Sequence, residues 1–518
     1  MLKRALSLVL LLVTVLSFAA CNGGGEAVDP TASTTDSQGV VSSVGCSGSV
    51  SDTDSGSDNT TDETTDTSTV KRPTNPTVDY PLTYGRDFVF LLQGDPESPF
   101  GVSAKDPRSK DVAERIEEVR KAYFCTFELQ QVPDAGPDFL ANMQARQFAS
   151  NPGDLLFADV PSIRSIIGVG GDSSLLVDLT YADDELDFWN TGKWGSIAAR
   201  SSMMAGGRFY GLIPNLWPTH SAVTSDVLVY NRQVLSAFNV PDPLEYWEKN
   251  AWDREVMLRS FTSVLNEEKE VYGIYSSSER MVRATVLASG VPFAKIDRLN
   301  QDETVEWSFG VTSAQTVEAL EWLQNSMKTH AKYFNCGKTD VTFDRADALA
   351  NGNAAFSLLS FPTILSQVAT NMEDFGMVLW AGKKANTYYE SHEDTLFGVA
   401  IPVFAQDAAL SACLIYDLFK GFDDVNDRED LLTYYRNTYF EKNSGVEILF
   451  LTRGTRTHYY PMAGGDVILD EICTGLLEAE SVETLVKNAA EHQKELFELH
   501  DLSNLAALDR YRQSGYFE

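Results

Sequence analysis

The chain has 518 residues, and its 74 acidic side chains outnumber its 41 basic ones to give a formal net charge of −33. This balance repels nucleic acid and anionic membrane surfaces, so it argues against a nucleic-acid partner. The roughly 440 residues that follow position 80 are too many for one hydrophobic core of ordinary size, which predicts two lobes.

The first twenty residues have the pattern of an export signal. Lys3 and Arg4 precede an almost unbroken apolar stretch at 5–18, and the two alanines after it are small residues that a signal peptidase accepts. The apolar stretch is shorter than the ~20 residues that a bilayer-spanning helix needs. We therefore expect residues 1–20 to be a signal peptide.

Residues 18–21, with the sequence FAAC, resemble the bacterial lipobox, although phenylalanine stands where leucine is usual. The resemblance implies cleavage before Cys21 and a diacylglycerol on its thiol, which would hold the chain on the extracellular face of the cell membrane. An ordinary secretory signal, with Cys21 unmodified in the mature chain, is the alternative.

Residues 21–80 have a composition that cannot build a core. Ten acidic residues face only Lys71 and Arg72, and serine, threonine and glycine are abundant. We expect a disordered acidic linker, because such segments bury too little apolar surface to fold. A flexible chain of this length has a root-mean-square reach of roughly 40 Å, enough to act as a tether.

The remaining chain alternates between strand and helix patterns, which predicts an α/β fold with a mainly parallel sheet covered by helices. Apolar runs predict the strands, and apolar residues at helical spacing predict the helices between them. The first strands are expected at 87–92, 125–132 and 154–160, with helices at 109–123 and 139–148, and two further buried strands at 354–359 and 375–380.

Ligands in open parallel sheets bind beyond the carboxyl ends of the strands. This rule selects residues directly after, or at the end of, predicted strands as ligand-binding candidates: Gln93, Asp159, Ser360, Phe361 and Trp380. Each has a structural alternative, because an aspartate at this place caps the next helix and the two aromatic rings could belong to the core.

Four passages in order resemble the extracellular solute-binding proteins of family 1, the maltose-binding-protein type. The passages are 151–156 with 175–180, 207–214 with 227–232, 241–254, and 349–356. The chain departs from the family pattern in two places, since Ala251 replaces the threonine before the family tryptophan and Pro152 is shifted relative to Asp154.

The resemblance implies a two-lobe periplasmic-binding-protein-like fold of the class II type, with a hinge and an interlobe cleft. The first lobe would comprise 81–214 and 396–422, and the second 227–380. The chain would cross between the lobes near 214–226 and 381–395, and a helical region at 423–518 would pack across them.

The same resemblance implies a protein that captures a small polar solute, a sugar or oligosaccharide above all, and delivers it to an ABC permease. No bond is broken in such a process, and no cofactor or metal takes part. We expect a monomer whose partners are the solute, the permease subunits and, through the lipid anchor, the membrane. Peptide or polyamine cargo is the alternative within this class.

Trp217 is the strongest candidate for stacking on a sugar ring. It lies in a proline-flanked stretch, PNLWPTHS, that looks exposed and falls at the predicted crossing. Packing between the lobes is the alternative. His220 in the same stretch could donate a hydrogen bond to the ligand, or could simply be solvated.

An enzyme is the rival class, and a surface carbohydrate-active hydrolase is its most concrete form. The sequence holds no GxSxG and no HExxH, so it offers no nucleophile elbow and no zinc motif of that kind. Paired carboxylates for glycoside hydrolysis stay possible among 74 acidic residues. A structural or adhesive surface lipoprotein is a third class, although the sequence shows neither repeats nor an all-β pattern.

Four widely spaced cysteines follow the linker, at positions 125, 336, 413 and 473. None forms a CxxC motif. We expect buried thiols, with one disulfide as the alternative in an exported protein.

Overall fold

The computed structural model divides the chain into two units, Met1–Val78 and Asp79–Glu518. All described residues belong to the second unit, so the predicted export signal, Cys21 and the linker lie outside the described part. The described residues are 86–94, 99–102, 107–134, 136–149, 153–168, 174–195, 197–217, 226–299, 305–335, 346–385, 397–422, 424–425, 428–440, 444–447, 465–478 and 481–513.

The first sheet has the strand order β13-β3-β1-β2. β1 (Asp87–Gln93), β2 (Thr126–Val132) and β3 (Leu155–Asp159) are parallel, and β13 (Phe397–Ala400) runs antiparallel to β3. The three parallel strands lie where the apolar runs predicted them. A strand from beyond position 396 thus completes a sheet that the first part of the chain begins.

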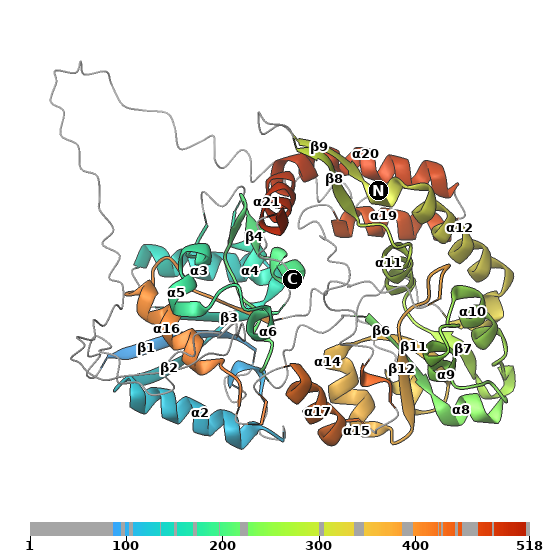
Figure 1. The fold of residues 1–518 in the computed structure, drawn as a ribbon, viewed down its shortest axis with the longest axis horizontal. Coiled ribbons are helices and arrows are strands. Elements are labelled where there is room, and N and C mark those ends of the chain that lie inside the picture. Colours follow the sequence, from blue (N-terminus) through green and yellow to red (C-terminus); the bar gives the residue numbers. More distant parts are fainter. Residues whose placement is uncertain are drawn as a thin grey trace, which may run out of the picture. The chain divides into compact units, whose positions relative to one another are not determined.

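Helices cover both faces of the first sheet. α2 (Ser109–Ala122) packs on the face that carries Phe88 and Phe90, whereas α3 (Pro137–Ala149) and α4 (Val160–Ser165) pack on the face that carries Val89 and Leu91 (Figure 1). Alternate residues of β1 therefore enter two different clusters, as the period of two in a strand requires. Because both faces are buried, β1 has a continuous apolar run.

The second sheet has the strand order β10-β7-β11-β6-β12. Its strands are β6 (Asp226–Asn231), β7 (Tyr272–Tyr275), β10 (Phe334–Asn335), β11 (Ala354–Ser360) and β12 (Phe375–Val378). β7, β10 and β11 are parallel, but β6 runs antiparallel to both of its neighbours. The sheet is therefore mixed, and the fold as a whole is α/β as predicted.

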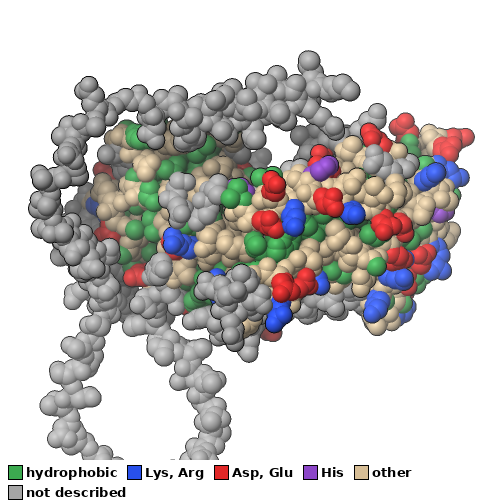
Figure 2. Space-filling model, turned by 90° about the horizontal axis from the view of Figure 1, so that it is seen from above, with side chains coloured by type: hydrophobic (Ala, Val, Ile, Leu, Met, Phe, Trp, Pro, Cys, Tyr) green, Lys and Arg blue, Asp and Glu red, His purple; other side chains and the backbone are tan. Residues whose placement is uncertain are grey.

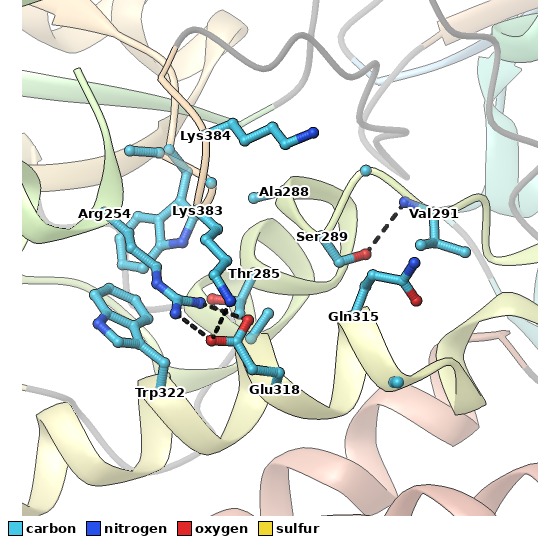
Figure 3. Close-up of a pocket in the computed structure, with 16 residues that line it drawn as sticks. Arg254, Thr285, Ala288, Ser289, Val291, Gln315, Glu318, Trp322, Lys383 and Lys384 are labelled. Carbon is cyan, nitrogen blue, oxygen red and sulfur yellow. Dashed lines mark hydrogen bonds and ion pairs between the residues drawn. The ribbon is translucent and has the colours of Figure 1, made fainter. Parts of the chain in front are cut away.

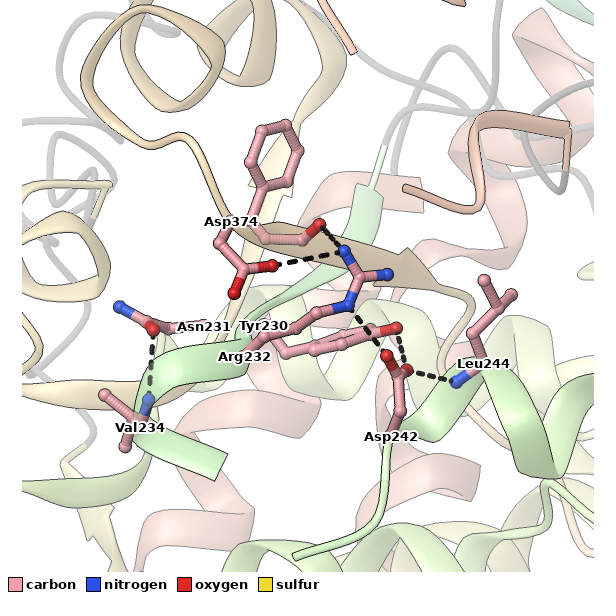
Figure 4. A network of polar contacts seen from close by, with 8 residues as sticks. Tyr230, Asn231, Arg232, Val234, Asp242, Leu244 and Asp374 are labelled. Atoms are coloured by element: carbon pink, nitrogen blue, oxygen red, sulfur yellow. Dashed lines mark hydrogen bonds and ion pairs between the residues drawn. The ribbon is translucent and has the colours of Figure 1, made fainter. Parts of the chain in front are cut away.

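A polar network ties β6 to the start of β12 and to α9 (Pro243–Glu248). The hydroxyl of Tyr230 donates to Asp242, which also accepts from Arg232 Nε at 2.7 Å and from the Leu244 amide at 2.9 Å. Arg232 in turn donates to the Phe375 carbonyl at 2.6 Å (Figure 4). Burial is the main cause that raises the pKa of Tyr230, so this phenol stays a donor.

The chain after position 226 also forms the helices α8 (Arg232–Ala237), α10 (Arg254–Thr262), α11 (Ser278–Ala288), α12 (Ala314–Thr329), α16 (Ala408–Leu418) and α17 (Arg428–Thr438). β8 (Ala294–Leu299) and β9 (Val305–Phe309) form an antiparallel pair. Shorter elements are α5 (Asp183–Leu186), α6 (Thr191–Trp194), α7 (Ile197–Ser201), β4 (Met204–Ala205), β5 (Arg208–Phe209), α13 (Ala346–Ala350), α14 (Phe361–Thr363) and α15 (Ala369–Asn371).

The chain ends in three helices, α19 (Gly465–Leu477), α20 (Val482–His500) and α21 (Leu502–Gln513). On α21, Asn504 accepts from the Gly207 amide at 3.0 Å, and Tyr511 donates to the Gly207 carbonyl at 3.2 Å. On α20, Phe497 packs against Trp307 of β9 with ring centroids 4.4 Å apart. These helices therefore contact elements that precede position 214 and elements that follow position 226.

Candidate functional site

Gln93 and Asp159 meet at the carboxyl edge of the first sheet, where they end the adjacent parallel strands β1 and β3. Gln93 Nε2 donates to Asp159 Oδ2 at 3.0 Å, and the Asp159 amide donates to Gln93 Oε1 at 2.8 Å. Asp159 Oδ1 also accepts from the Ser162 amide at 2.8 Å and so caps α4. Asp159 therefore does cap a helix, as the structural alternative expected. Gln93 and Asp159 together form a half-buried polar pair.

Ser360 ends β11 at the corresponding edge of the second sheet, in register with Asp226 of the antiparallel strand β6. Both residues are buried, and Ser360 Oγ lies 2.7 Å from Thr363 Oγ1 and accepts from the Thr363 amide at 3.3 Å. Asp226 forms an ion pair with Arg280 of α11. Sequence reasoning missed Asp226 and Arg280, although Asp226 begins an apolar strand and follows a polar stretch.

Phe361 follows Ser360 but packs into the core. Its exposed fraction is 3%, and its ring lies edge-on to Tyr435 of α17 with centroids 5.3 Å apart. This packing favours the core alternative, and a role of Phe361 toward a ligand stays a prediction.

Trp217 is fully buried, so the expectation that its stretch exposes it is wrong. The indole packs against Phe419 and Phe422 with centroids 4.9 and 5.8 Å away, and its Nε1 donates to the Phe100 carbonyl at 3.1 Å. The flanking prolines and polar residues suggested a surface loop, but they do not determine which way the indole points. His220 lies outside the described residues.

Trp380 follows β12 and lines a pocket of about 490 Å³. The pocket is bounded by the first residue of α10, the second half of α11, the first three turns of α12, and the segment 380–384 that leaves the sheet. We call it the crossing-segment pocket. None of Gln93, Asp159, Ser360 and Phe361 lines it.

A charged cluster lies along one wall of the crossing-segment pocket. Arg254 donates to both carboxylate oxygens of Glu318, with Nη1 at 3.1 Å from Oε2, and Lys383 Nζ lies 3.3 Å from Oε1 (Figure 3). The Arg254 hydrogen bond is the main cause that lowers the pKa of Glu318, which is therefore ionised at neutral pH. The guanidinium also lies 5.3 Å from the ring centroid of Trp322.

Within the described ranges, no group of three or more His, Cys, Asp or Glu side chains could hold a metal ion. No helix among the described residues is long and apolar enough to cross a membrane. On the face seen in Figure 2, acidic and basic side chains are interspersed, and neither sign forms a continuous patch.

Two of the four predicted buried thiols are confirmed as buried and free, Cys125 and Cys473. Cys413 is half-buried, which corrects that part of the expectation, and Cys336 lies outside the described residues.

No protein-family model matches the sequence, and no curated protein matches it either. Solved structures, by contrast, match over most of the chain. A Listeria monocytogenes ABC substrate-binding protein in complex with cycloalternan superposes with a TM-score of 0.52 and 14% identity, covering 80% of this chain and 99% of that one. A cyclo/maltodextrin-binding protein complexed with maltotetraose gives a TM-score of 0.53 and 14% identity, covering 80% and 98%.

A third match, a Staphylococcus aureus extracellular solute-binding protein in complex with maltose, gives a TM-score of 0.53 and 12% identity, again covering 80% and 98%. At these identities the likeness establishes the fold. The chain therefore has the two-lobe α/β fold of ABC solute-binding proteins, which confirms the predicted fold class.

Proposed function

We propose that this protein is an extracellular solute-binding protein that captures a sugar or oligosaccharide and delivers it to an ABC permease. The observation that carries the proposal is the pair of buried or half-buried polar strand ends, Gln93 with Asp159 in one sheet and Ser360 with Asp226 in the other. Each pair lies at the sheet edge where α/β folds place their ligands.

The comparisons support a carbohydrate, because matching structures hold cycloalternan, maltotetraose and maltose. Sugar hydroxyls are both donors and acceptors, and amide, carboxylate and hydroxyl side chains at strand ends suit them. In this proposal the lobes close on the ligand, and the closed form is favoured only by contacts that both lobes make to it.

Thermal unfolding of the full-length chain tests the proposal. The panel would contain maltose, maltotetraose and cycloalternan, with amino acids, short peptides and polyamines as the contrasting classes. A ligand at ~1,000 times its dissociation constant adds about 4 kcal/mol of apparent stability, which moves the unfolding midpoint by several degrees. A shift confined to peptides or polyamines would overturn the carbohydrate assignment.

Binding without chemistry is the second part of the proposal. Incubation with maltotetraose should yield no shorter product, whereas a carbohydrate-active hydrolase would release one. Product that accumulates in proportion to protein concentration would support the hydrolase instead.

We also propose that Cys21 carries the lipid that anchors the protein to the extracellular face of the cell membrane. The lipobox-like residues 18–21 and the acidic linker behind them support this. Labelling with an alkyne-bearing fatty acid in a bacterial host should mark the chain and its Cys46→Ser variant, but not Cys21→Ser. Equal labelling of both variants would contradict the anchor.

A further inference from the structure

The segment 419–440 connects the first sheet to the second. Its beginning packs on the first sheet, where Phe419 stacks on Phe157 of β3 with ring centroids 6.2 Å apart. Its end packs on the second sheet, where Phe440 lies edge-on to Phe375 of β12 with ring centroids 6.0 Å apart. The chain therefore makes a connection here in addition to the two crossings predicted from sequence.

A closed turn lies in the middle of this connection. Phe422 and Val425 each donate to the other's carbonyl at 2.9 Å, and Arg115 of α2 donates to the carbonyls of the two residues before Phe422, at 2.8 and 2.9 Å. α17 begins at Arg428, shortly after the turn. Because these contacts hold the turn to α2, a rotation of one sheet relative to the other is taken up in this connection after Val425.

Arg108, which directly precedes α2, contacts residues on both sides of that point. Its guanidinium donates to both carboxylate oxygens of Asp424, with Nη1 2.6 Å from Oδ1, and lies 5.2 Å from the ring centroid of Phe422. It also lies 4.3 Å from the ring centroid of Tyr434 on α17. One cation therefore joins a turn held to the first sheet and a helix packed on the second.

The two contacts of Arg108 have different roles. The Arg108 hydrogen bond is the main cause that lowers the pKa of Asp424, so this pair stays charged at neutral pH and fixes the guanidinium beside the turn. The contact with Tyr434 reaches past the turn, so it depends on how the two sheets are oriented. Since the exposed fraction of Arg108 is only 5%, the attraction to the ring is weakly screened by water.

The second-sheet end of this contact lies close to a predicted ligand residue. Tyr435 follows Tyr434 on α17, and its ring lies edge-on to Phe361 with centroids 5.3 Å apart. Phe361 directly follows Ser360, the strand end that the proposed function assigns to the solute. α17 therefore extends from Arg108 to the edge of the second sheet that carries Ser360.

We propose that Arg108, Asp424 and Tyr434 form an interlobe latch that sets the balance between the open and closed conformations of the chain. The inference rests on the proposed function, in which two lobes close on a solute. Arg108 is a positioning residue, because it acts on solute affinity through this balance and not by touching the solute. A contact that is made in only one of two conformations shifts their populations toward that conformation.

Interlobe distances in the full-length chain test the latch directly. Spin labels on ketone-bearing amino acids at Lys121 of α2 and Lys249 after α9, both exposed, report the distance distribution by pulsed electron paramagnetic resonance. Tyr434→Leu keeps an apolar side chain but removes the ring, and Arg108→Gln removes the cation. Each should change the ratio of the two conformations about fivefold, as expected for the loss of one buried cation–ring contact, and the double variant should change it no further.

Arg120→Gln and Tyr272→Leu are the matched controls. Arg120 is an exposed arginine of the same helix, paired with Glu117, and Tyr272 is a half-buried tyrosine of β7. Both variants should keep the wild-type distances. Circular dichroism establishes that each chain is folded before its distances are compared.

Titration calorimetry with maltotetraose measures the consequence for binding. A variant whose distances move toward those of the sugar-bound wild-type chain should bind more tightly, and one whose distances move away should bind more weakly. Unchanged distances and affinity in the folded Arg108→Gln and Tyr434→Leu chains would overturn the latch. An affinity changed by Arg108→Gln alone would make Arg108 a direct solute contact and overturn it as well. If maltotetraose does not bind the wild-type chain, the sugar assignment fails, and the distances alone decide on the latch.

Discussion

Gln93 and Asp159 bond to each other twice across the ends of two neighbouring parallel strands. The Gln93 amide group donates to the carboxylate at 3.0 Å and accepts from the Asp159 main chain at 2.8 Å. The second carboxylate oxygen caps α4. The pair is therefore held in one orientation by contacts on both sides, which is the property that a precise ligand contact needs.

Substitution of Asp159 separates its cap role from a ligand role. Asp159→Ala removes the cap and should lower the free energy of unfolding by about 1 kcal/mol or more, whereas Asp159→Asn keeps an oxygen for the Ser162 amide and should lower it less. If Asp159 contacts the sugar, both variants weaken binding. Urea unfolding and calorimetry measure the two effects, and an Asp159→Asn chain that binds sugar like wild type would reduce Asp159 to a cap.

Trp217 tests the distinction between core and binding site. Trp217→Ala opens a large cavity among Phe100, Phe419 and Phe422, and it should cost about 3–5 kcal/mol of unfolding free energy. Trp217→Phe should cost less and leave sugar affinity unchanged in the folded fraction. A Trp217→Phe chain with wild-type stability and no sugar binding would instead restore the stacking role.

The three parallel strands of the first sheet could be predicted from sequence because each is a local pattern, whereas β13, which joins them from position 397 onward, was not predicted. The apolar run at 87–92 and the helical spacing before Tyr123 involve neighbours only. The strand-end rule selected Gln93 and Asp159 as candidates, and the structure places these two residues in contact. The mixed character of the second sheet could not be predicted in this way, since the direction of β6 is set by its partners at 354–360 and 375–378.

The direction in which a side chain points could not be predicted from the sequence either, where the residues that pack against it are distant in sequence. Trp217 is buried by Phe100 and Phe419, which lie more than one hundred residues away on either side. The ion pair of Asp226 with Arg280 spans 54 positions, and the crossing-segment pocket draws on four separate stretches. No local periodicity carries such information.

Gly376 is a position where a single methyl group should disrupt the second sheet. A Cβ there would lie 2.2 Å from Tyr230 Cζ, and the ring cannot move aside because it is fully buried and its hydroxyl is bonded to Asp242. Gly376→Ala should therefore cost about 1–3 kcal/mol of unfolding free energy.

Gly192→Ala is the matched control for Gly376→Ala. The nearest atom to its added methyl is the Asn190 side-chain oxygen 3.2 Å away, which caps α6 and must shift by a few tenths of an ångström, whereas the helical position itself favours alanine. Urea unfolding should place the control within about 0.5 kcal/mol of wild type. Equal stability of the two variants would mean that β6 and β12 can separate without loss.

Cys125 should make stability depend on alkaline pH. Burial is the main cause that raises the pKa of this thiol from 9.0 to about 11, so the folded chain holds the proton to higher pH than the unfolded chain does. The stability that this group contributes is complete below pH 9 and is lost as the pH rises from there toward about 11.

Cys125→Ala lacks the titrating group, so its stability should decline less steeply over this interval, although it is lower at neutral pH because a buried side chain is shortened. Urea unfolding of both chains from about pH 8 to about pH 11 measures the two slopes. Parallel slopes would show that the Cys125 thiol ionises equally easily in the folded and unfolded chains.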